Sequence, residues 1–356
     1  MMVAVLCRKL DGSPTNGFER YSHNLVSGVK EAGITSVQPN QEARMPIKPS
    51  GSLMGPPYFD IIFPIWQIVR GHMKADVFHA VTDSQAIIFP WLKGKKIVTM
   101  HHVDKTPPDS IPEAIFRAFY GLGTRIALKQ ADVIICISSQ TKKEVMESYG
   151  VPAERIALIP QAISSAFHPM PGTKKEGTIG YIGALKKRKN VEFLVRAFAA
   201  YMKREDNPPM RLAIYGNGTD LFYLKALSSE LGVAEEVDFH EPVDEDKLVQ
   251  TYNSFSLFVL PSFQEGFGFP IIEAQACGVP VLTVKGALIP EEVTRFTVEC
   301  DGEDSMADQM ARLLRDREYR EKIISDGIRH AGTFSVKEMG YRTASVYKSV
   351  YDQGRS

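Results

Sequence analysis

Short apolar runs alternate with amphipathic stretches along the whole chain. In the first half the apolar runs are Val3–Cys7, Asp76–Ala80, Lys96–Met100 and Val133–Ser138, and a helix is expected from Phe18 to about Ala32. Short β-rich runs separated by helices are typical of parallel sheets that are covered on both faces. The pattern therefore predicts an α/β protein, with the segment 154–160 adding one more strand to the first series.

A second series of the same kind begins after residues 164–176, which hold two prolines and a glycine without periodicity and are expected to be a linker. A length of 356 residues is enough for two domains with separate cores. We therefore predict domains at 1–163 and 177–335, followed by a helix at 336–356. The second series comprises strands at 178–183, 211–215, 237–239, 257–260 and 281–284, and helices at 190–202, 220–231, 245–252, from about 270, and 305–315.

Composition excludes few functions, but it limits the compartment and the partners. The formal charge is zero, with a small positive excess in the first half, which gives no reason to expect nucleic acid. The four cysteines, Cys7, Cys136, Cys277 and Cys300, lack metal-ligand spacing and are expected to be reduced, which favours the cytoplasm. No signal peptide or apolar run of membrane-spanning length is recognised in the sequence.

Two glutamates in the second half point to chemistry. The strand Leu257–Leu260 runs through a glycine-containing loop into a helix that begins near Pro270, with Glu265 in the loop and Glu273 one helical turn inside. Glycines let the backbone approach a ligand, and the helix N-terminus offers free N–H groups to an anion. Two isolated glutamates would more simply be a dipole-favoured carboxylate and a solvated residue. Together with the loop, they can hold two hydroxyl-bearing parts of one phosphorylated ligand, such as a nucleotide sugar.

The run Pro-Ser-x-x-Glu-Gly-Phe-Gly-x-Pro-x-x-Glu-Ala-x-Ala-x-Gly-Val-Pro-Val at 261–281 resembles the signature of retaining glycosyltransferases of the family 4 type. The resemblance implies the GT-B fold, in which two Rossmann-like, doubly wound domains face each other across a cleft. It also implies that the helix at 336–356 packs back on the N-terminal domain.

In the C-terminal half, the resemblance implies a donor site on loops that follow strands. Glu265 and the N–H groups around it would hold the sugar, Glu273 the ribose, and the cations Arg188 and Lys189 the diphosphate. From spacing alone, the alternative for the run 186–189 is a solvated basic surface, which is common. The family's first arginine is replaced by Ala184, the main departure from its pattern. The remaining donor-binding candidates are Gly183, Gly216, Gly218, Val243, Ser262, Gly266, Phe267 and Gly268.

In the N-terminal half, the resemblance implies an acceptor side and one histidine at the donor sugar. His101 ends a strand and is assigned to that sugar, while His102 stands where the family has Asp. Asn16 and Gly17 open the first helix, where a phosphate or the acceptor would bind; a plain turn is an equal alternative. His79 ends another strand and is assigned to the acceptor side, although a lone histidine of this kind is more often structural.

These assignments predict a retaining hexosyltransferase that uses GDP-mannose or a UDP-sugar and a glycan or lipid-linked hydroxyl acceptor. We expect no cofactor and no metal, because no Asp-x-Asp is placed to bind a divalent ion. The apolar stretch Tyr58–Val69, with Trp66, is expected to be a core helix; the second interpretation is peripheral contact with the inner face of a membrane. A non-catalytic nucleotide-sugar binder is the first alternative function. An NAD-dependent oxidoreductase is the second, and it lacks a Gly-x-Gly-x-x-Gly after the first strand.

Overall fold

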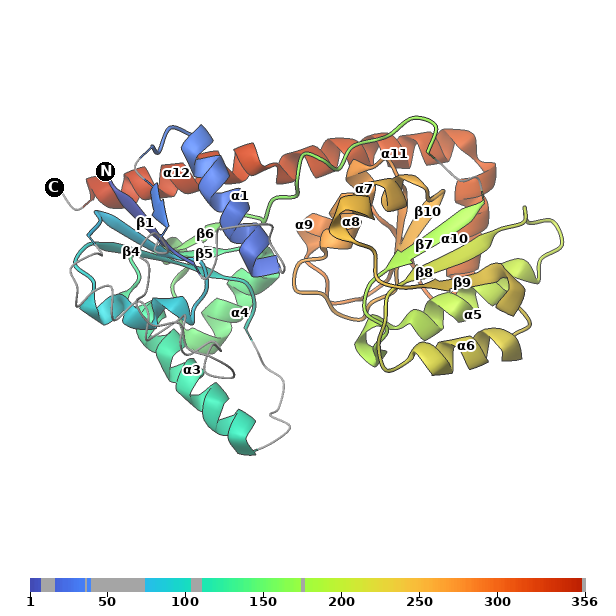
Figure 1. The fold of residues 1–356 in the computed structure, drawn as a ribbon, viewed down its shortest axis with the longest axis horizontal. Helices are drawn as coiled ribbons and strands as arrows, with labels where there is room; N and C mark the ends of the chain where they lie inside the picture. Colours follow the sequence, from blue (N-terminus) through green and yellow to red (C-terminus); the bar gives the residue numbers. More distant parts are fainter. Residues whose placement is uncertain (8–16, 36, 40–73, 104–110, 174–176, 354–356) are drawn as a thin grey trace. The chain divides into compact units, whose positions relative to one another are not determined.

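The computed structural model describes residues 1–7, 17–35, 37–39, 74–103, 111–173 and 177–353 (Figure 1). The chain divides into two compact units: unit 1 is Met1–Ala162 with Val336–Ser356, and unit 2 is Ile163–Ser335. Asn16 and the stretch 58–69 lie outside the described residues, so their predicted roles stay predictions. Among the described helices, none has both the length and the apolar character needed to span a bilayer.

Unit 1 is built on one parallel sheet with strand order β2-β1-β3-β4-β5-β6. Its core strands are buried along their length, as the continuous apolar runs predicted. The elements are β1 (Val3–Leu6), α1 (Gly17–Glu31), β2 (Val37–Pro39), β3 (Val77–Ala80), η3 (Gln85–Trp91), β4 (Lys95–Met100), α3 (Ile111–Gln130), β5 (Val133–Cys136), α4 (Ser139–Tyr149), η4 (Ala153–Arg155), β6 (Ile156–Leu158) and α12 (Val336–Asp352).

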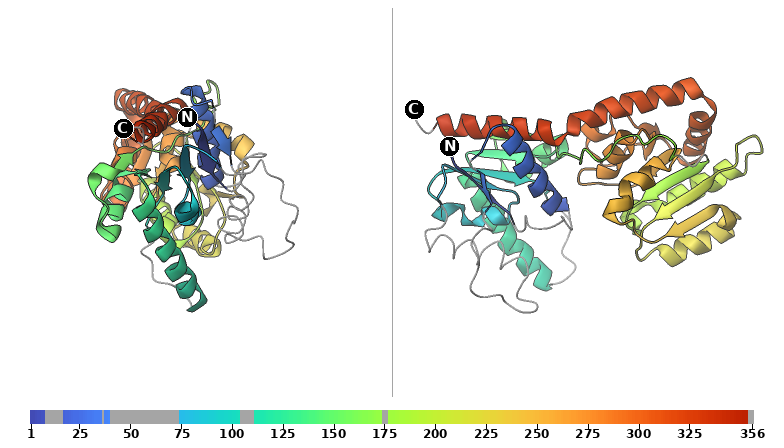
Figure 2. Two further views of the ribbon diagram at one scale, coloured as in Figure 1. Left: turned by 90° about the vertical axis from the view of Figure 1, so that its left-hand side faces the viewer. Right: turned by 45° about the horizontal axis from the view of Figure 1, so that its top comes forward.

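Unit 2 repeats this architecture with a parallel sheet of strand order β12-β11-β10-β7-β8-β9. Figure 2 shows its helices on both faces: α5, α6 and α10 pack together on one, and α7, α8 and α11 on the other. The elements are β7 (Thr178–Ile182), η5 (Lys187–Lys189), α5 (Val191–Met202), β8 (Arg211–Tyr215), α6 (Leu221–Glu230), η6 (Ala234–Glu236), β9 (Val237–His240), α7 (Glu245–Asn253), β10 (Leu257–Leu260), α8 (Phe269–Ala276), β11 (Val281–Val284), α9 (Glu291–Thr294), β12 (Val298–Cys300), α10 (Glu303–Arg315), α11 (Arg317–Ala331) and η7 (Gly332–Phe334).

The segment that the sequence assigned to a linker is packed along part of its length. Asn253, at the end of α7, accepts a hydrogen bond from the N–H of Met170 at 2.7 Å and donates one to the carbonyl of His168 at 3.0 Å. The ring of Phe167 meets Tyr252 edge-on at 6.0 Å. Residues 167–170 therefore belong to unit 2, because side chains in the last turn of α7 bind them.

The C-terminal helix α12 crosses α1 within unit 1 through two glycines (Figure 1). A Cβ added to Gly28 would lie 2.4 Å from the carbonyl oxygen of Val336, and one added to Gly340 would lie 2.1 Å from the carbonyl carbon of Gly28. Distances this short are excluded for real side chains, so the backbones of the two helices touch only because both positions are glycine.

A buried chain of hydrogen bonds ties α12 to the sheet of unit 1. The hydroxyl of Tyr347 lies 2.6 Å from His79 Nδ1, and His79 Nε2 lies 2.8 Å from Thr99 Oγ1. Thr99 Oγ1 in turn lies 3.0 Å from the hydroxyl of Tyr21 on α1. These side chains are almost completely buried, and each polar atom has a partner, as buried polar groups require.

The glycine crossing can be tested with two single substitutions in unit 1. Gly28→Ala should lower the free energy of unfolding of unit 1 by about 1–3 kcal/mol, because the added methyl group overpacks a backbone contact. Gly121→Ala is the matched control on α3, where no atom of the described part of the chain lies within 4 Å of the added Cβ. It should leave stability unchanged or raise it by up to about 1 kcal/mol.

Trp91 belongs to unit 1 and the sequence of unit 2 contains no tryptophan, so tryptophan fluorescence during urea unfolding does not report on unit 2 and can follow unit 1. Equal effects of the two substitutions would contradict the close crossing of α1 and α12.

Candidate functional site

The signature loop of unit 2 connects β10 to α8 and is held on both sides by backbone hydrogen bonds. The N–H of Phe263 donates to the carbonyl of Arg188 at 3.2 Å, which joins the loop to η5. On the other side, the N–H of Glu265 donates to the carbonyl of Leu288 at 3.0 Å, and the N–H of Leu288 donates to the carbonyl of Phe263 at 2.7 Å. The loop is therefore fixed between the connections that follow β7 and β11.

A buried ion pair adds to this attachment. Lys189 Nζ donates to both carboxylate oxygens of Glu265, at 2.6 Å to Oε1 and 2.7 Å to Oε2. The side chains are only 13% and 9% exposed, respectively. Lys189 comes from η5, which the amide of Asn190 also ties to the carbonyl of Pro261 at 3.1 Å. The two residues assigned separately to diphosphate and sugar are thus joined to each other, a contact that the sequence analysis did not foresee.

The start of α8 offers several hydrogen-bond donors without acceptors. Gly268 precedes the helix with φ of 98°, a conformation that favours glycine, and Pro270 occupies the first turn. Within the described residues, the backbone N–H groups of Gly266, Phe267 and Gly268 find no acceptor. Three successive free N–H groups at the positive end of a helix dipole form a favourable place for an anion.

Ser262 adds a side-chain donor to the same loop. It is completely buried, and its hydroxyl has no hydrogen-bond partner within the described part of the chain. A buried hydroxyl without a partner costs about 1–3 kcal/mol, so its presence calls for an explanation. The loop thus holds four polar groups, three backbone and one side-chain, whose hydrogen-bonding capacity is unused.

Glu273 lies inside unit 2 rather than on a solvated face. Only 4% of the residue is exposed, and its Oε2 accepts a hydrogen bond from the Tyr252 hydroxyl at 2.9 Å. Burial, and next the charge of Glu273, raises the pKa of the neighbouring Cys277 thiol to about 12. The alternative interpretation of Glu273 as a solvated surface residue is therefore wrong. Its predicted contact with a ribose stays a prediction.

The glycines after β7 and β8 serve the packing of two loops against each other. The N–H of Gly183 donates to the carbonyl of Tyr215 at 3.0 Å, and the N–H of Leu185 donates to the carbonyl of Asn217 at 2.8 Å. A Cβ added to Gly216 would lie 1.9 Å from the carbonyl oxygen of Gly183, and one added to Gly218 would lie 2.1 Å from that of Leu185. The two residues are glycines because a neighbouring backbone occupies the space of a side chain.

The remaining candidates of unit 2 are less constrained. Arg188 is exposed, and within the described residues its guanidinium forms no ion pair. Ala184 is half-buried, and its carbonyl accepts a hydrogen bond from the Tyr181 hydroxyl at 3.0 Å. Val243 lies half-buried between β9 and α7. Arg188 is thus a charged group of this site that is available to a ligand.

His101 in unit 1 follows β4, is half-buried, and has a hydrogen-bond partner at each ring nitrogen. Its Nε2 lies 2.8 Å from the carbonyl of Val81, and its Nδ1 lies 3.1 Å from the side-chain amide of Gln161. A carbonyl only accepts, so these partners assign the proton to Nε2. Phe18 and Tyr21 meet the ring edge-on at 4.9 and 4.8 Å. Burial lowers the pKa of His101 to about 4, so the imidazole is neutral at pH 7.

The other candidates of unit 1 differ sharply in exposure. His79 is 0% exposed, and both ring nitrogens are bonded inside the core, so its assignment to the acceptor side is corrected to a structural role. Burial lowers its pKa to about 3. His102 and Gly17 are exposed, and no described atom lies within 4 Å of a Cβ added at Gly17. Gly17 therefore shows no structural need for glycine in this structure.

Two residues at these sites were not singled out from the sequence. Gln161 orients His101, and Tyr252 binds Glu273. Neither stands in a motif with His101 or Glu273, since 60 and 21 residues separate the partners. No cluster of three or more His, Cys, Asp or Glu side chains suited to a metal occurs within the described residues.

Comparisons with known proteins agree with the signature. The family described as Glycosyltransferase Family 4 matches residues 15–167, and the family described as Glycosyl transferases group 1 matches residues 166–330. The chain is 29% identical over 244 residues to a D-inositol 3-phosphate glycosyltransferase of Nocardia farcinica, a match that covers 63% of the chain and 53% of that protein. It is 29% identical over 238 residues to the O-antigen chain mannosyltransferase B of Escherichia coli, covering 62% of each. The chain thus spans less than two thirds of these relatives.

Solved structures show the fold. The sucrose-phosphate synthase of Thermosynechococcus elongatus superposes with a TM-score of 0.73 at 18% identity, covering 99% of both chains. The HepE protein of Anabaena, solved in complex with UDP and glucose, superposes with a TM-score of 0.67 at 18% identity, covering 98% of this chain and 100% of the other. The predicted GT-B fold is thereby confirmed.

The Lys189–Glu265 pair predicts a specific pattern of stability. Lys189→Met or Glu265→Gln should each lower the free energy of unfolding of unit 2 by about 3–5 kcal/mol, because each leaves an unpaired buried charge or polar partner. The double variant should lose much less than the sum, since neither charge is then left alone. Scanning calorimetry measures the effect.

Glu321→Gln is the matched control, because Glu321 pairs with Arg317 on the surface, where both side chains are more than half exposed. This substitution should hardly change stability. Losses as small for Lys189→Met and Glu265→Gln as for the control would show that the buried pair has no structural role.

Proposed function

Since the chain belongs to the family of glycosyl transferases group 1, we propose that it moves a hexose from a nucleotide-diphosphate sugar to a hydroxyl acceptor. GDP-mannose and UDP-sugars are the proposed donors, and a glycan or a lipid-linked molecule is the proposed acceptor. The names of the relatives support this range, because they include a mannosyltransferase of an O-antigen chain and an inositol phosphate glycosyltransferase.

The observation that carries the proposal is the set of unused donors at the start of α8. The N–H groups of residues 266–268 and the buried hydroxyl of Ser262 have no acceptors within the described residues. Hydrogen bonds to a charged group contribute about 1.5–3 kcal/mol each, so an anion there would gain several such bonds without rearranging the loop. A diphosphate is an anion with oxygens enough to use them.

The Lys189–Glu265 ion pair determines how the charges of this site would change when a donor binds. While Lys189 is bonded to both oxygens of Glu265, the two charges cancel, and the net positive charge comes from the exposed cations at 186–188 and the helix dipole. An incoming diphosphate competes with Glu265 for the Lys189 ammonium. The sugar hydroxyls can then donate to Glu265 oxygens that the ammonium has released. Binding of the phosphate and of the sugar would therefore favour each other.

In the transfer step, the developing negative charge on the leaving diphosphate is the group that must be stabilised. Lys189, Arg188 and the N–H groups before α8 can do so in the proposed complex. We also propose that the reaction keeps the anomeric configuration and needs no divalent metal. His101 is neutral with its proton on Nε2, so its proposed part is to contact the donor sugar and not to supply a charge.

A non-catalytic sugar-nucleotide binder is the second candidate, favoured by Ala184. An alanine stands where the family has arginine, and its carbonyl is already bonded to Tyr181. Such a protein would bind the donor but would release no nucleoside diphosphate in the presence of an acceptor. Turnover with any acceptor would exclude it.

The proposal predicts transfer that survives excess EDTA and yields a product with the donor's anomeric configuration. A panel of GDP-mannose and UDP-sugars with inositol phosphate and glycan acceptors tests transfer by release of the nucleoside diphosphate. Proton NMR then reads the configuration from the anomeric coupling. Activity lost in EDTA and restored by Mg²⁺ would contradict the leaving-group argument, and an inverted product would contradict the retaining mechanism.

In the same assay, Lys189→Ala should lower kcat, because its charge acts most strongly on the leaving diphosphate. Lys322→Ala on α11 is the matched control, since Lys322 is exposed in unit 2 and lies outside the site. Equal kcat values for the two variants would remove Lys189 from the reaction.

A further inference from the structure

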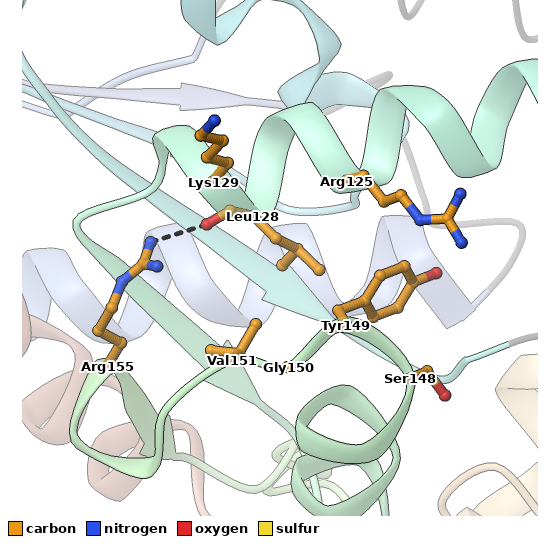
Figure 3. Close-up of a pocket in the computed structure, with 8 residues that line it drawn as sticks. All are labelled: Arg125, Leu128, Lys129, Ser148, Tyr149, Gly150, Val151 and Arg155. Atoms are coloured by element: carbon orange, nitrogen blue, oxygen red, sulfur yellow. Dashed lines mark hydrogen bonds between the residues drawn. The ribbon is translucent and has the colours of Figure 1, made fainter.

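A second basic site lies in unit 1, at the opposite edge of the sheet from His101. Helix α3 ends just before β5, and helix α4 ends just before β6, so both C-termini lie where these strands begin. Between them is a pocket of about 350 Å³ (Figure 3). Its volume falls within the range of small-ligand sites. We call it the basic pocket, and its argument uses six lining residues: Arg125, Leu128, Lys129, Tyr149, Val151 and Arg155.

The lining of the basic pocket contains three cations and no carboxylate. Within the described residues, Arg125, Lys129 and Arg155 form no ion pair. Arg155 also stabilises the end of α3, because its Nη2 donates to the carbonyl of Leu128 at 2.7 Å and to that of Ala131. Arg125 and Lys129 are exposed, and no such hydrogen bond to a backbone carbonyl is formed by either within the described residues.

The partial negative charge of helix C-termini also attracts cations, so the three cations could be explained by the helix ends or by a ligand site. The sizes of these charges decide between the two explanations. Each C-terminus carries about half a negative charge, and α3 and α4 together therefore account for about one of the three cations. Asp83 is the nearby carboxylate whose charge is felt at Tyr149. Burial is the main cause that raises the pKa of Tyr149, the charge of Asp83 raises it further, and Arg125 lowers it. Asp83 also accepts a hydrogen bond from Thr124 at 2.7 Å. Two further carboxylates lie near in sequence, Asp132, which pairs with Lys95 at 3.2 Å, and Glu154, and neither lines the pocket.

The shape of the pocket separates its charges. Figure 3 shows Arg125 beside the Tyr149 hydroxyl at one end and Arg155 at the other, while the Lys129 ammonium points away from Arg155. Leu128 and Val151 lie between them, and they are 2% and 6% exposed, so the floor is apolar and closed. A ligand that fits must therefore carry negative charge and a small uncharged body.

We propose that the basic pocket binds a phosphate ester, either a soluble phosphomonoester or the phosphate headgroup of a lipid. Arg and Lys are the usual partners of phosphate, and Arg can donate two parallel hydrogen bonds to it. The pocket is separate from the donor site, because all of its residues belong to unit 1. They lie where β5 and β6 begin and not in the loops directly after the carboxyl ends of strands. The proposal therefore does not rest on the proposed function.

The test compares two double variants with the same change of charge. Arg125→Gln/Lys129→Gln removes two pocket cations and keeps Arg155, which holds the end of α3. Lys93→Gln/Lys143→Gln is the control, because both lysines are exposed in unit 1 and neither lines the pocket. Thermal unfolding confirms that both variants fold, as expected for exposed side chains.

Two probes distinguish the sources of the phosphate. Calorimetry with glycerol 3-phosphate, in the presence of saturating UDP and GDP, measures a soluble ester. Sedimentation with phosphatidylglycerol vesicles, with phosphatidylcholine vesicles as reference, measures a headgroup. In at least one arm, the pocket variant should bind at least about tenfold more weakly than wild type while the control variant binds normally.

A loss confined to glycerol 3-phosphate identifies a soluble ligand, and a loss in the vesicle arm identifies a lipid headgroup. Absence of binding to both probes overturns the proposal. So does binding by the pocket variant that equals wild type, or an equal loss in both double variants, which would reflect net charge alone.

Discussion

Every strand pair in both sheets is parallel, and the rest of the structure depends on this constraint. A parallel strand can be followed by another only after the chain has returned from one edge of the sheet to the other, usually as a helix. The carboxyl ends of all strands in a sheet consequently meet at one edge, and the loops that follow them are neighbours. Open sheets of this kind bind ligands at that edge. In unit 2 the loops after β7, β10 and β11 are joined there by backbone hydrogen bonds.

Within this frame, backbone hydrogen bonds to Arg188 and Leu288 hold the loop before α8, and the Lys189–Glu265 pair adds to them while leaving the N–H groups of the loop free. The carboxylate that could have bonded to those N–H groups is bound to an ammonium instead. The polar groups that have no partner in the free protein, the Ser262 hydroxyl among them, are then available to a ligand. Because the loop is already held in place, it loses little entropy when the ligand binds. The stability cost of such groups is typical of sites whose ligand completes the hydrogen bonding.

The fold could be predicted because its signals are local. The strand Arg211–Tyr215 was bounded correctly and the last helix was predicted to begin at Val336, where it does, since apolar runs and helical periodicity reflect which side chains are buried. Helix α11 was not predicted, because its sequence is largely charged and its start depends on Asp316 accepting from the N–H of Tyr319. Strand β12 was also missed, since three residues carry too little pattern.

The site could be predicted only in outline, because its decisive contacts are between distant residues. The motif placed Glu265 and Lys189 at the carboxyl edge, but 76 residues separate them, and nothing in either motif says that they pair. His79 was misassigned for a similar reason. A histidine at a strand end looks the same in sequence whether its partners are a ligand or Tyr347, which lies 268 residues away.

The central claim is that the free N–H groups before α8 receive a nucleoside diphosphate. Amide hydrogen exchange with and without UDP or GDP tests this directly, because an N–H group that gains an acceptor exchanges more slowly. The account predicts slower exchange at Gly266, Phe267 and Gly268 in the presence of the nucleotide that the protein prefers. Unchanged exchange at these three residues under saturating nucleotide, with protection confined to unit 1, would contradict it.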